Sequence, residues 1–190
     1  MRPVKVWVIG PCHFATDSTA CATNARRCEA VAERWREGDL VYVTGHVSRR
    51  PGGPTLDSIT ADALVALGIP PRSITTGTVN GIFPEAEHVT RDIWRLKVLG
   101  QSPSMTWVCS DWYNKAAEPV WMLEAAKYGL PIDFHSVFGT GGPKIRRFYA
   151  AYGLVIRIAM KTALTHRLLA SVMTRYYRRR ADRFTMNGCA

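Results

Sequence analysis

Short apolar runs alternate with longer amphipathic segments along most of the chain. The apolar runs favour β-strands and cover residues 4–10, 40–44, 73–78, 105–109 and 132–137. The segments between them carry apolar residues at helical spacing, are each followed by a glycine, and cover residues 24–37, 57–67, 84–99 and 118–128. Strands that alternate with helices in this way predict an α/β domain.

The alternation predicts a Rossmann-like three-layer sandwich, with a mostly parallel five-stranded sheet between two helix layers. A different pattern follows residues 139–143, GTGGP. From Lys144 to about Phe184, apolar residues recur every three or four positions, which predicts an amphipathic helix or a helix pair with Gly153 as a candidate bend. We therefore divide the chain into a Rossmann-like α/β domain, residues 1–143, and a basic amphipathic helical C-terminal extension, residues 144–190.

The net charge of +10 comes entirely from this extension. Residues 1–143 hold 14 basic and 14 acidic side chains, whereas residues 144–190 hold 11 basic side chains and the single acid Asp182. Residues 175–184, RYYRRRADRF, mix arginines with aromatics, as surfaces that bind nucleic acid or anionic membranes do. The alternative interpretation is that the apolar stripe packs on the sheet or on a second subunit and leaves the arginines in water.

Composition narrows the class of protein. Apolar residues at 47% and charged residues at 21% indicate a folded chain rather than a disordered one. We expect no transmembrane segment, because no run of about 18 uncharged apolar residues occurs. The apolar part of MRPVKVWVIG is too short for a secretion signal, and the cysteine pattern favours reduced thiols, so we expect a cytoplasmic protein. The five cysteines show no CxxC spacing and no HExxH motif occurs, so we expect neither a disulfide framework nor a metal site.

Polar residues follow four successive predicted strands. In an open α/β sheet, the loops at the carboxyl ends of the strands form the ligand crevice. These positions hold Gly10 after the first strand, Thr44, Gly45 and His46 at the second, Asn80 after the third, and Ser110 and Asp111 after the fourth. We predict that they converge at one edge of the sheet.

Each candidate side chain also has a simpler interpretation. Arg27 could bind a phosphate or a carboxylate with two parallel hydrogen bonds, although Arg26 and Arg27 are adjacent and at least one of them should be solvated. His46 is either an acid–base group or a solvated loop residue. Glu85 either acts in the site or favours a helix dipole, and Ser110 and Asp111 either face a ligand or cap a helix.

The ordered elements resemble the YdcF/SanA/ElyC-like family of Rossmann-type domains over about residues 4–135. The resemblance rests on VIG, an arginine leading the first helix, VYVTG, ADALVALGIPPRSI, a Glu-bearing helix start and VCSDW. By this resemblance Arg27, Thr44, Gly45, Glu85 and Ser110 match motif positions, and His46 stands in place of the last Gly of the second motif. The His and Arg that the family carries after Ser110 are missing, and Lys115 stands nearby as a replacement cation.

The resemblance implies a small-molecule site at the carboxyl edge of the sheet, with S-adenosylmethionine as the ligand proposed for one branch and envelope maintenance as the role of others. We therefore expect a small anionic, nucleotide-like ligand. The candidate catalytic residues are His46, Glu85 and Asp111, and the candidate ligand-binding residues are Gly10, Arg27, Thr44, Gly45, Asn80, Ser110 and Lys115. The sequence leaves open which reaction occurs and whether the chain is an enzyme.

Two alternative functions stand beside this one. The stretches IGP and LEAAKYGLPI are similar to nucleoside deoxyribosyltransferase-like proteins, which use a Glu nucleophile on a helix, and Glu124 is the corresponding candidate. The second is a non-catalytic module that binds nucleic acid or an anionic membrane through its basic C-terminal helix, which is also a candidate contact for a second copy. A further possibility is an inactive relative, kept for its interactions after losing the His and Arg of the family.

Overall fold

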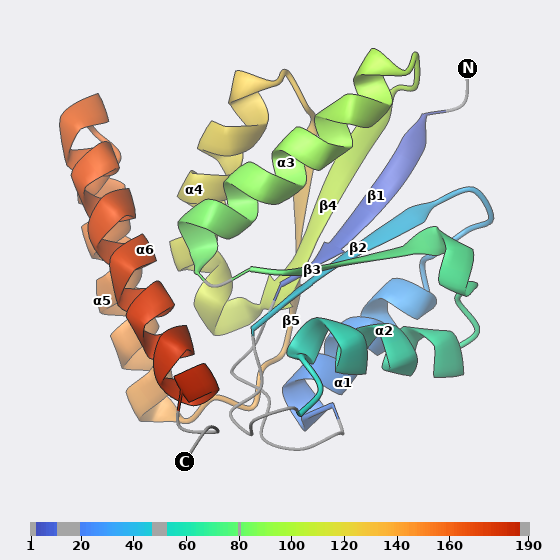
Figure 1. The fold of residues 1–190 in the computed structure, drawn as a ribbon, viewed down its shortest axis with the longest axis horizontal. Coiled ribbons are helices and arrows are strands. Elements are labelled where there is room, and N and C mark those ends of the chain that lie inside the picture. Colours follow the sequence, from blue (N-terminus) through green and yellow to red (C-terminus); the bar gives the residue numbers. More distant parts are fainter. Residues whose placement is uncertain (1–2, 11–19, 47–52, 80, 187–190) are drawn as a thin grey trace.

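Five parallel strands form the sheet at the centre of the computed structural model (Figure 1). The structure describes residues 3–10, 20–46, 53–79 and 81–186. The strands are β1 (Val4–Ile9), β2 (Leu40–Gly45), β3 (Ile74–Thr78), β4 (Pro103–Ser110) and β5 (Ile132–Val137). Their order is β3-β2-β1-β4-β5, and every neighbouring pair is parallel. The predicted strands are therefore confirmed, and the described sheet is wholly parallel.

Helices cover both faces of the sheet, which confirms the Rossmann-like three-layer sandwich (Figure 1). Helices α1 (Ala22–Ala32) and α2 (Leu56–Ala66) pack on one face, and α3 (Ile82–Val98) and α4 (Asp111–Lys127) pack on the other. A short 3-10 turn, η1 (Pro71–Ser73), precedes β3. The helices contribute the apolar faces that a sheet buried on both sides requires.

Alternation along each strand divides the core into two clusters. Val6, Val8 and Trp107 face the α3 and α4 side, whereas Trp7 and Val108 face the α1 and α2 side. Successive side chains of a strand point to opposite faces, so this register also determines where the last residue of each strand points.

The extension forms two helices, α5 (Pro143–Ala159) and α6 (Ala163–Met186), which lie outside α4 and α3 (Figure 1). The helix-pair interpretation is therefore confirmed, but the break falls at residues 160–162 and the bend expected at Gly153 is wrong. Gly153 is buried within α5, where an added Cβ would lie 3.2 Å from the Ala116 Cα atom of α4. The glycine permits close contact between two helices.

Helix α4 begins at Asp111, seven residues before the predicted start at Glu118. The segment SDWYNK was expected to be a loop, and its residues after Ser110 are instead the first turns of the helix. Pro119 lies inside the helix, although proline usually marks a first turn, which explains why the sequence pattern suggested the later start.

Candidate functional site at the carboxyl edge of the sheet

A buried arginine lies at the point where the strand order reverses. The chain proceeds from β1 outward to β2 and β3 and then crosses to β4, so β1 and β4 flank the switch point. Arg27 of α1 is 0% exposed. Its Nη1 donates to the Gly10 carbonyl oxygen at 2.6 Å and its Nη2 donates to Ser110 Oγ at 2.8 Å. The guanidinium thus joins the carboxyl ends of both strands.

The register of β4 explains this contact. Ser110 lies two residues after Val108, so its side chain points to the α1 face, where Arg27 lies in the second turn of the helix. Asn24, one turn earlier, donates to Thr60 Oγ1 at 2.6 Å and ties α1 to α2. Arg26 is exposed and donates to the Phe138 carbonyl oxygen at 3.2 Å. Of the two adjacent arginines, Arg27 is therefore the one at the switch point.

A buried carboxyl lies on the other side of the same edge. Glu85, in the first turn of α3, is 1% exposed and hydrogen-bonds to Thr44 Oγ1 at the end of β2. Burial raises the pKa of the Glu85 carboxyl to about 8, while the Thr44 hydrogen bond and the positive charge of Arg27 act in the opposite direction. At neutral pH most of this carboxyl is therefore protonated.

Thr44 joins the buried carboxyl of Glu85 to the end of β1. Thr44 Oγ1 also donates to the Ile9 carbonyl oxygen at 3.1 Å. A hydroxyl has one hydrogen, and a carbonyl oxygen can only accept. The single hydrogen of Thr44 is therefore shared between Glu85 Oε1 and the Ile9 carbonyl oxygen. An ionised Glu85 would compete with Ile9 for the same hydrogen.

The charge of Arg27 is therefore poorly balanced. The guanidinium carries a positive charge, and the pKa of Glu85, about 8, leaves that neighbouring carboxyl mostly neutral at pH 7. Within the described residues no carboxylate forms an ion pair with Arg27, and Arg27 Nε has no hydrogen-bond partner there. A buried positive charge without a full counter-ion favours an anion at this position.

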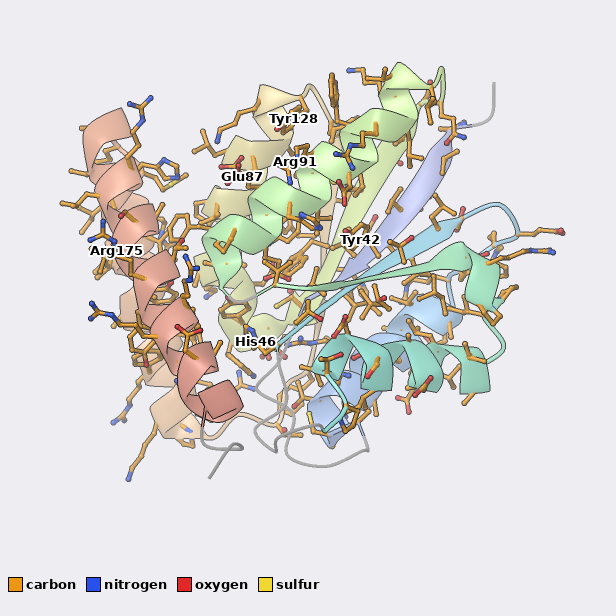
Figure 2. The ribbon with its side chains drawn as sticks, viewed as in Figure 1. Tyr42, His46, Glu87, Arg91, Tyr128 and Arg175 are labelled. Atoms are coloured by element: carbon orange, nitrogen blue, oxygen red, sulfur yellow. The ribbon has the colours of Figure 1, made fainter. Side chains whose placement is uncertain are left out.

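An aromatic side of the site comes from the C-terminal extension. His46, 8% exposed at the end of β2 (Figure 2), lies nearly parallel to the Tyr177 ring of α6, with centroids 6.0 Å apart and an interplanar angle of 13°. Gly81 packs beneath Tyr177, and an added Cβ would lie 2.9 Å from the ring. Gly81 also has a φ of 106°, which favours glycine. Helix α6 thus closes one side of the carboxyl edge.

Asp111 joins α4 to the segment between β5 and α5. Its Oδ2 accepts a hydrogen bond from Arg146 Nη1 at 2.7 Å, and its Oδ1 accepts one from the Gly139 amide at 3.1 Å. Burial acts to raise the pKa of Asp111, but the hydrogen bonds from Arg146 and Gly139 outweigh it and hold the pKa below its ordinary value. The side chain therefore remains ionised, and both oxygens have partners. This environment favours a structural role over the predicted catalytic one.

The other predicted site residues have different surroundings. Gly10 meets the Trp107 ring, and a Cβ there would lie 2.0 Å from the ring. Gly45 allows β2 to approach α2, since a Cβ would lie 2.0 Å from the Asp57 amide nitrogen. Lys115 is exposed on α4. Asn80 lies outside the described residues, as do residues 11–19 and 47–52 of the two predicted loops.

The structure thus brings Gly10, Arg27, Thr44, Glu85 and Ser110 together, with His46 at the same edge. Sequence reasoning missed Arg146, Tyr177 and Asp57. Asp57 is 5% exposed and accepts a hydrogen bond from Thr78 Oγ1 at 3.1 Å. No local signal identifies these residues, because each acts on a partner that is distant in the sequence.

Among the described residues, no group of three or more His, Cys, Asp or Glu side chains could hold a metal ion.

Comparison with known proteins returned no match among family models, curated proteins or solved structures. Within the part of the chain that the structure describes, no helix has both the length and the apolar character needed to cross a membrane.

Proposed function

We propose that the chain binds a small anionic, nucleotide-like ligand at the carboxyl edge of the sheet, next to the switch point between β1 and β4. The observation that carries this proposal is the charge of Arg27, which is fully buried beside a carboxyl whose pKa of about 8 leaves it mostly neutral. A phosphate or carboxylate group of the ligand would balance that charge, and the Arg27 Nε–H is a donor without a described partner.

The aromatic side of the edge supports a nucleotide-like ligand over a simple anion. The Tyr177 ring, which lies parallel to His46, is close enough to Glu85 to feel its charge, and bases stack readily on aromatic rings. S-adenosylmethionine, the ligand that the YdcF-like resemblance implies, also carries a base and a carboxylate, and it remains within this proposal.

Glu85 is the strongest candidate for an acid–base role at this edge. A protonated, buried carboxyl can donate a hydrogen bond or a proton to a ligand near neutral pH. His46 is the second candidate by position. Asp111 is a weaker one, because its two oxygens are occupied by Arg146 and Gly139.

The deoxyribosyltransferase alternative receives no support from the geometry. Glu124 lies 13 residues after Asp111 on α4, which corresponds to about 20 Å along the helix away from the carboxyl edge. It pairs with Lys127 at 2.6 Å. A nucleophile at this position would be far from Arg27 and Glu85.

Thermal unfolding with a panel of nucleotides, S-adenosylmethionine and sugar phosphates tests the proposal. A ligand present at 100 times its dissociation constant should stabilise the protein by about 2.7 kcal/mol. Arg27→Gln should abolish the shift, and Arg26→Gln is the matched control because its side chain is exposed on the same helix.

Ser110→Ala provides a second variant in case Arg27→Gln fails to fold. It removes one acceptor of the guanidinium and should weaken ligand binding while α1 stays in place. If no compound of the panel shifts the unfolding of the unmodified chain, or if Arg26→Gln abolishes the shift as completely as Arg27→Gln, the site is not the one proposed.

A further inference from the structure

The outer face of the α5–α6 pair carries an unusual concentration of exposed apolar side chains. Leu154 and Ile158 of α5 are 56% and 57% exposed, and Leu168 and Val172 of α6 are 64% and 53% exposed. Between the two helices lies an apolar groove of about 400 Å³, lined by Val155, Ile158, Leu168 and Val172 among others. Such a surface indicates a binding partner rather than ordinary solvent exposure.

Exposed basic side chains lie on the same two helices as this groove. Arg157 and Arg167 are exposed and are the sequence neighbours of Ile158 and Leu168, Lys161 lies in the connection between the helices, and Arg175 lies one turn after Val172 on α6 (Figure 2). Residues 144–190 hold 11 basic side chains and one acidic side chain. The partner must therefore offer both apolar groups and negative charge.

We propose that the outer face of α5–α6 docks on the surface of an anionic lipid bilayer. Helices of 17 and 24 residues lying in the interface would bury their aliphatic side chains at the boundary between headgroups and acyl chains, while arginines and lysines contact anionic headgroups. The contact is peripheral, since no described helix is apolar enough to span the bilayer.

Two other occupants fit the face less well. A second copy would bring the same excess of 10 positive charges against it, and like charges repel across an interface. Nucleic acid would satisfy the arginines and would find exposed rings at Tyr176 and Phe148, but the groove itself is lined mainly with aliphatic side chains, which offer no stacking surface. The bilayer alone accounts for both properties.

Co-sedimentation of the full chain with lipid vesicles tests the proposal. Vesicles of phosphatidylcholine mixed with phosphatidylglycerol should bind the chain at least about tenfold more strongly than phosphatidylcholine alone, because α5, α6 and their connection carry several exposed basic residues. The double variant Leu168→Gln, Val172→Gln should lose most of the binding. Arg157→Gln with Arg167→Gln should reduce binding by about tenfold or more and weaken its salt dependence.

Val98→Gln with Leu99→Gln is the matched apolar control, because these side chains are 63% and 75% exposed at the end of α3. Arg91→Gln, exposed on α3, is the basic control. Both controls should bind like the unmodified chain. Every variant replaces exposed side chains, and circular dichroism should confirm unchanged folding.

Three outcomes would overturn the proposal. The first is equal binding to neutral and anionic vesicles, or none to either. The second is duplex or single-stranded DNA binding that the arginine variants weaken and the aliphatic variants leave unchanged, together with no vesicle binding. The third is a dimer in sedimentation velocity that the aliphatic variants dissociate while they leave vesicle binding intact.

Discussion

At the scale of single residues, burial determines the chemistry of the carboxyl edge. Glu85 and Asp111 are both carboxylates near that edge, yet the pKa of Glu85 is raised by burial and the pKa of Asp111 is lowered by its hydrogen bonds. Glu85 therefore holds a proton at neutral pH, and Asp111 holds a charge. The two side chains are suited to different tasks, proton donation and ion pairing.

Replacing Glu85 by Gln should remove a pH dependence of stability. The pKa of Glu85 rises from 4.5 to about 8 on folding, so the folded state retains a proton that the unfolded state loses between these values. The free energy of unfolding should therefore fall from pH 4.5 to pH 8 in the unmodified chain, and this contribution should vanish in Glu85→Gln. The difference should be on the order of a few kcal/mol.

Urea unfolding at a series of pH values measures this effect. Glu87→Gln is the control, because Glu87 is exposed two residues further along α3 (Figure 2). Its pH profile should follow that of the unmodified chain. Parallel profiles for Glu85→Gln and the unmodified chain would mean that Glu85 is ionised in the folded protein.

The sequence could predict residue types at the site but not all of their environments. Arg26 and Arg27 are equivalent by composition, and only the packing of α1 against β1 and β4 determines which guanidinium is buried. Likewise, Asp111 follows a strand as a ligand-facing residue would, but Arg146 lies 35 positions away, so no local pattern reveals the ion pair.

At the scale of elements, strands were easier to predict than helix starts. The predicted strands follow from short apolar runs between turn residues, and β5 spans Ile132–Val137 as predicted. The start of α4 was missed, because Trp112, Tyr113 and Asn114 have weak helix propensity and Pro119 suggests a later first turn. Tertiary contacts decide this start, since Asp111 is held by Arg146 and the Gly139 amide.

The Asp111–Arg146 contact should couple α4 to α5 modestly. Both side chains are about one-third exposed, at 34% and 35%, so solvent screens the pair. A double-mutant cycle with Asp111→Asn and Arg146→Gln should give a coupling energy of about 0.5–1 kcal/mol. Because the pKa of Asp111 is lowered on folding, this stabilisation should be lost as the pH falls through the folded-state value.

Equilibrium unfolding of the four proteins at neutral pH and again under acidic conditions provides the measurement. Arg95→Gln, which removes an exposed ion pair with Asp92 within α3, serves as a local comparison. Additive single-variant effects at neutral pH would show that the two side chains contribute independently.

At the scale of the whole molecule, the α5–α6 pair is integrated with the sandwich. The boundary at residue 143 coincides with the start of α5, but Ile156 is 0% exposed in the cluster shared with α3, α4 and the sheet. Gly153 contacts the α4 backbone. The sequence predicted the helical stripe, but it could not show which surface covers that stripe, because this depends on the final order of the strands.

Calorimetry of the full chain should show one cooperative unfolding transition. Packing of α5 on α4 joins the two predicted units into one core, so neither should unfold alone. Deleting residues 143–190 should destabilise the remainder strongly by exposing the α4 face that Ile156 covers. Two well-separated transitions would instead show that residues 1–143 and 144–190 unfold as separate units.

Through Tyr177, helix α6 contributes to the carboxyl edge as well as to the outer apolar face. This 24-residue helix carries Leu168 and Val172 on its outward side and, toward its end, the ring that lies over His46 and Gly81. Under the two proposals, lipid binding and ligand binding both involve contacts of helix α6. If vesicles change the affinity of the chain for its ligand by some factor, the ligand must then change the affinity of the chain for vesicles by the same factor.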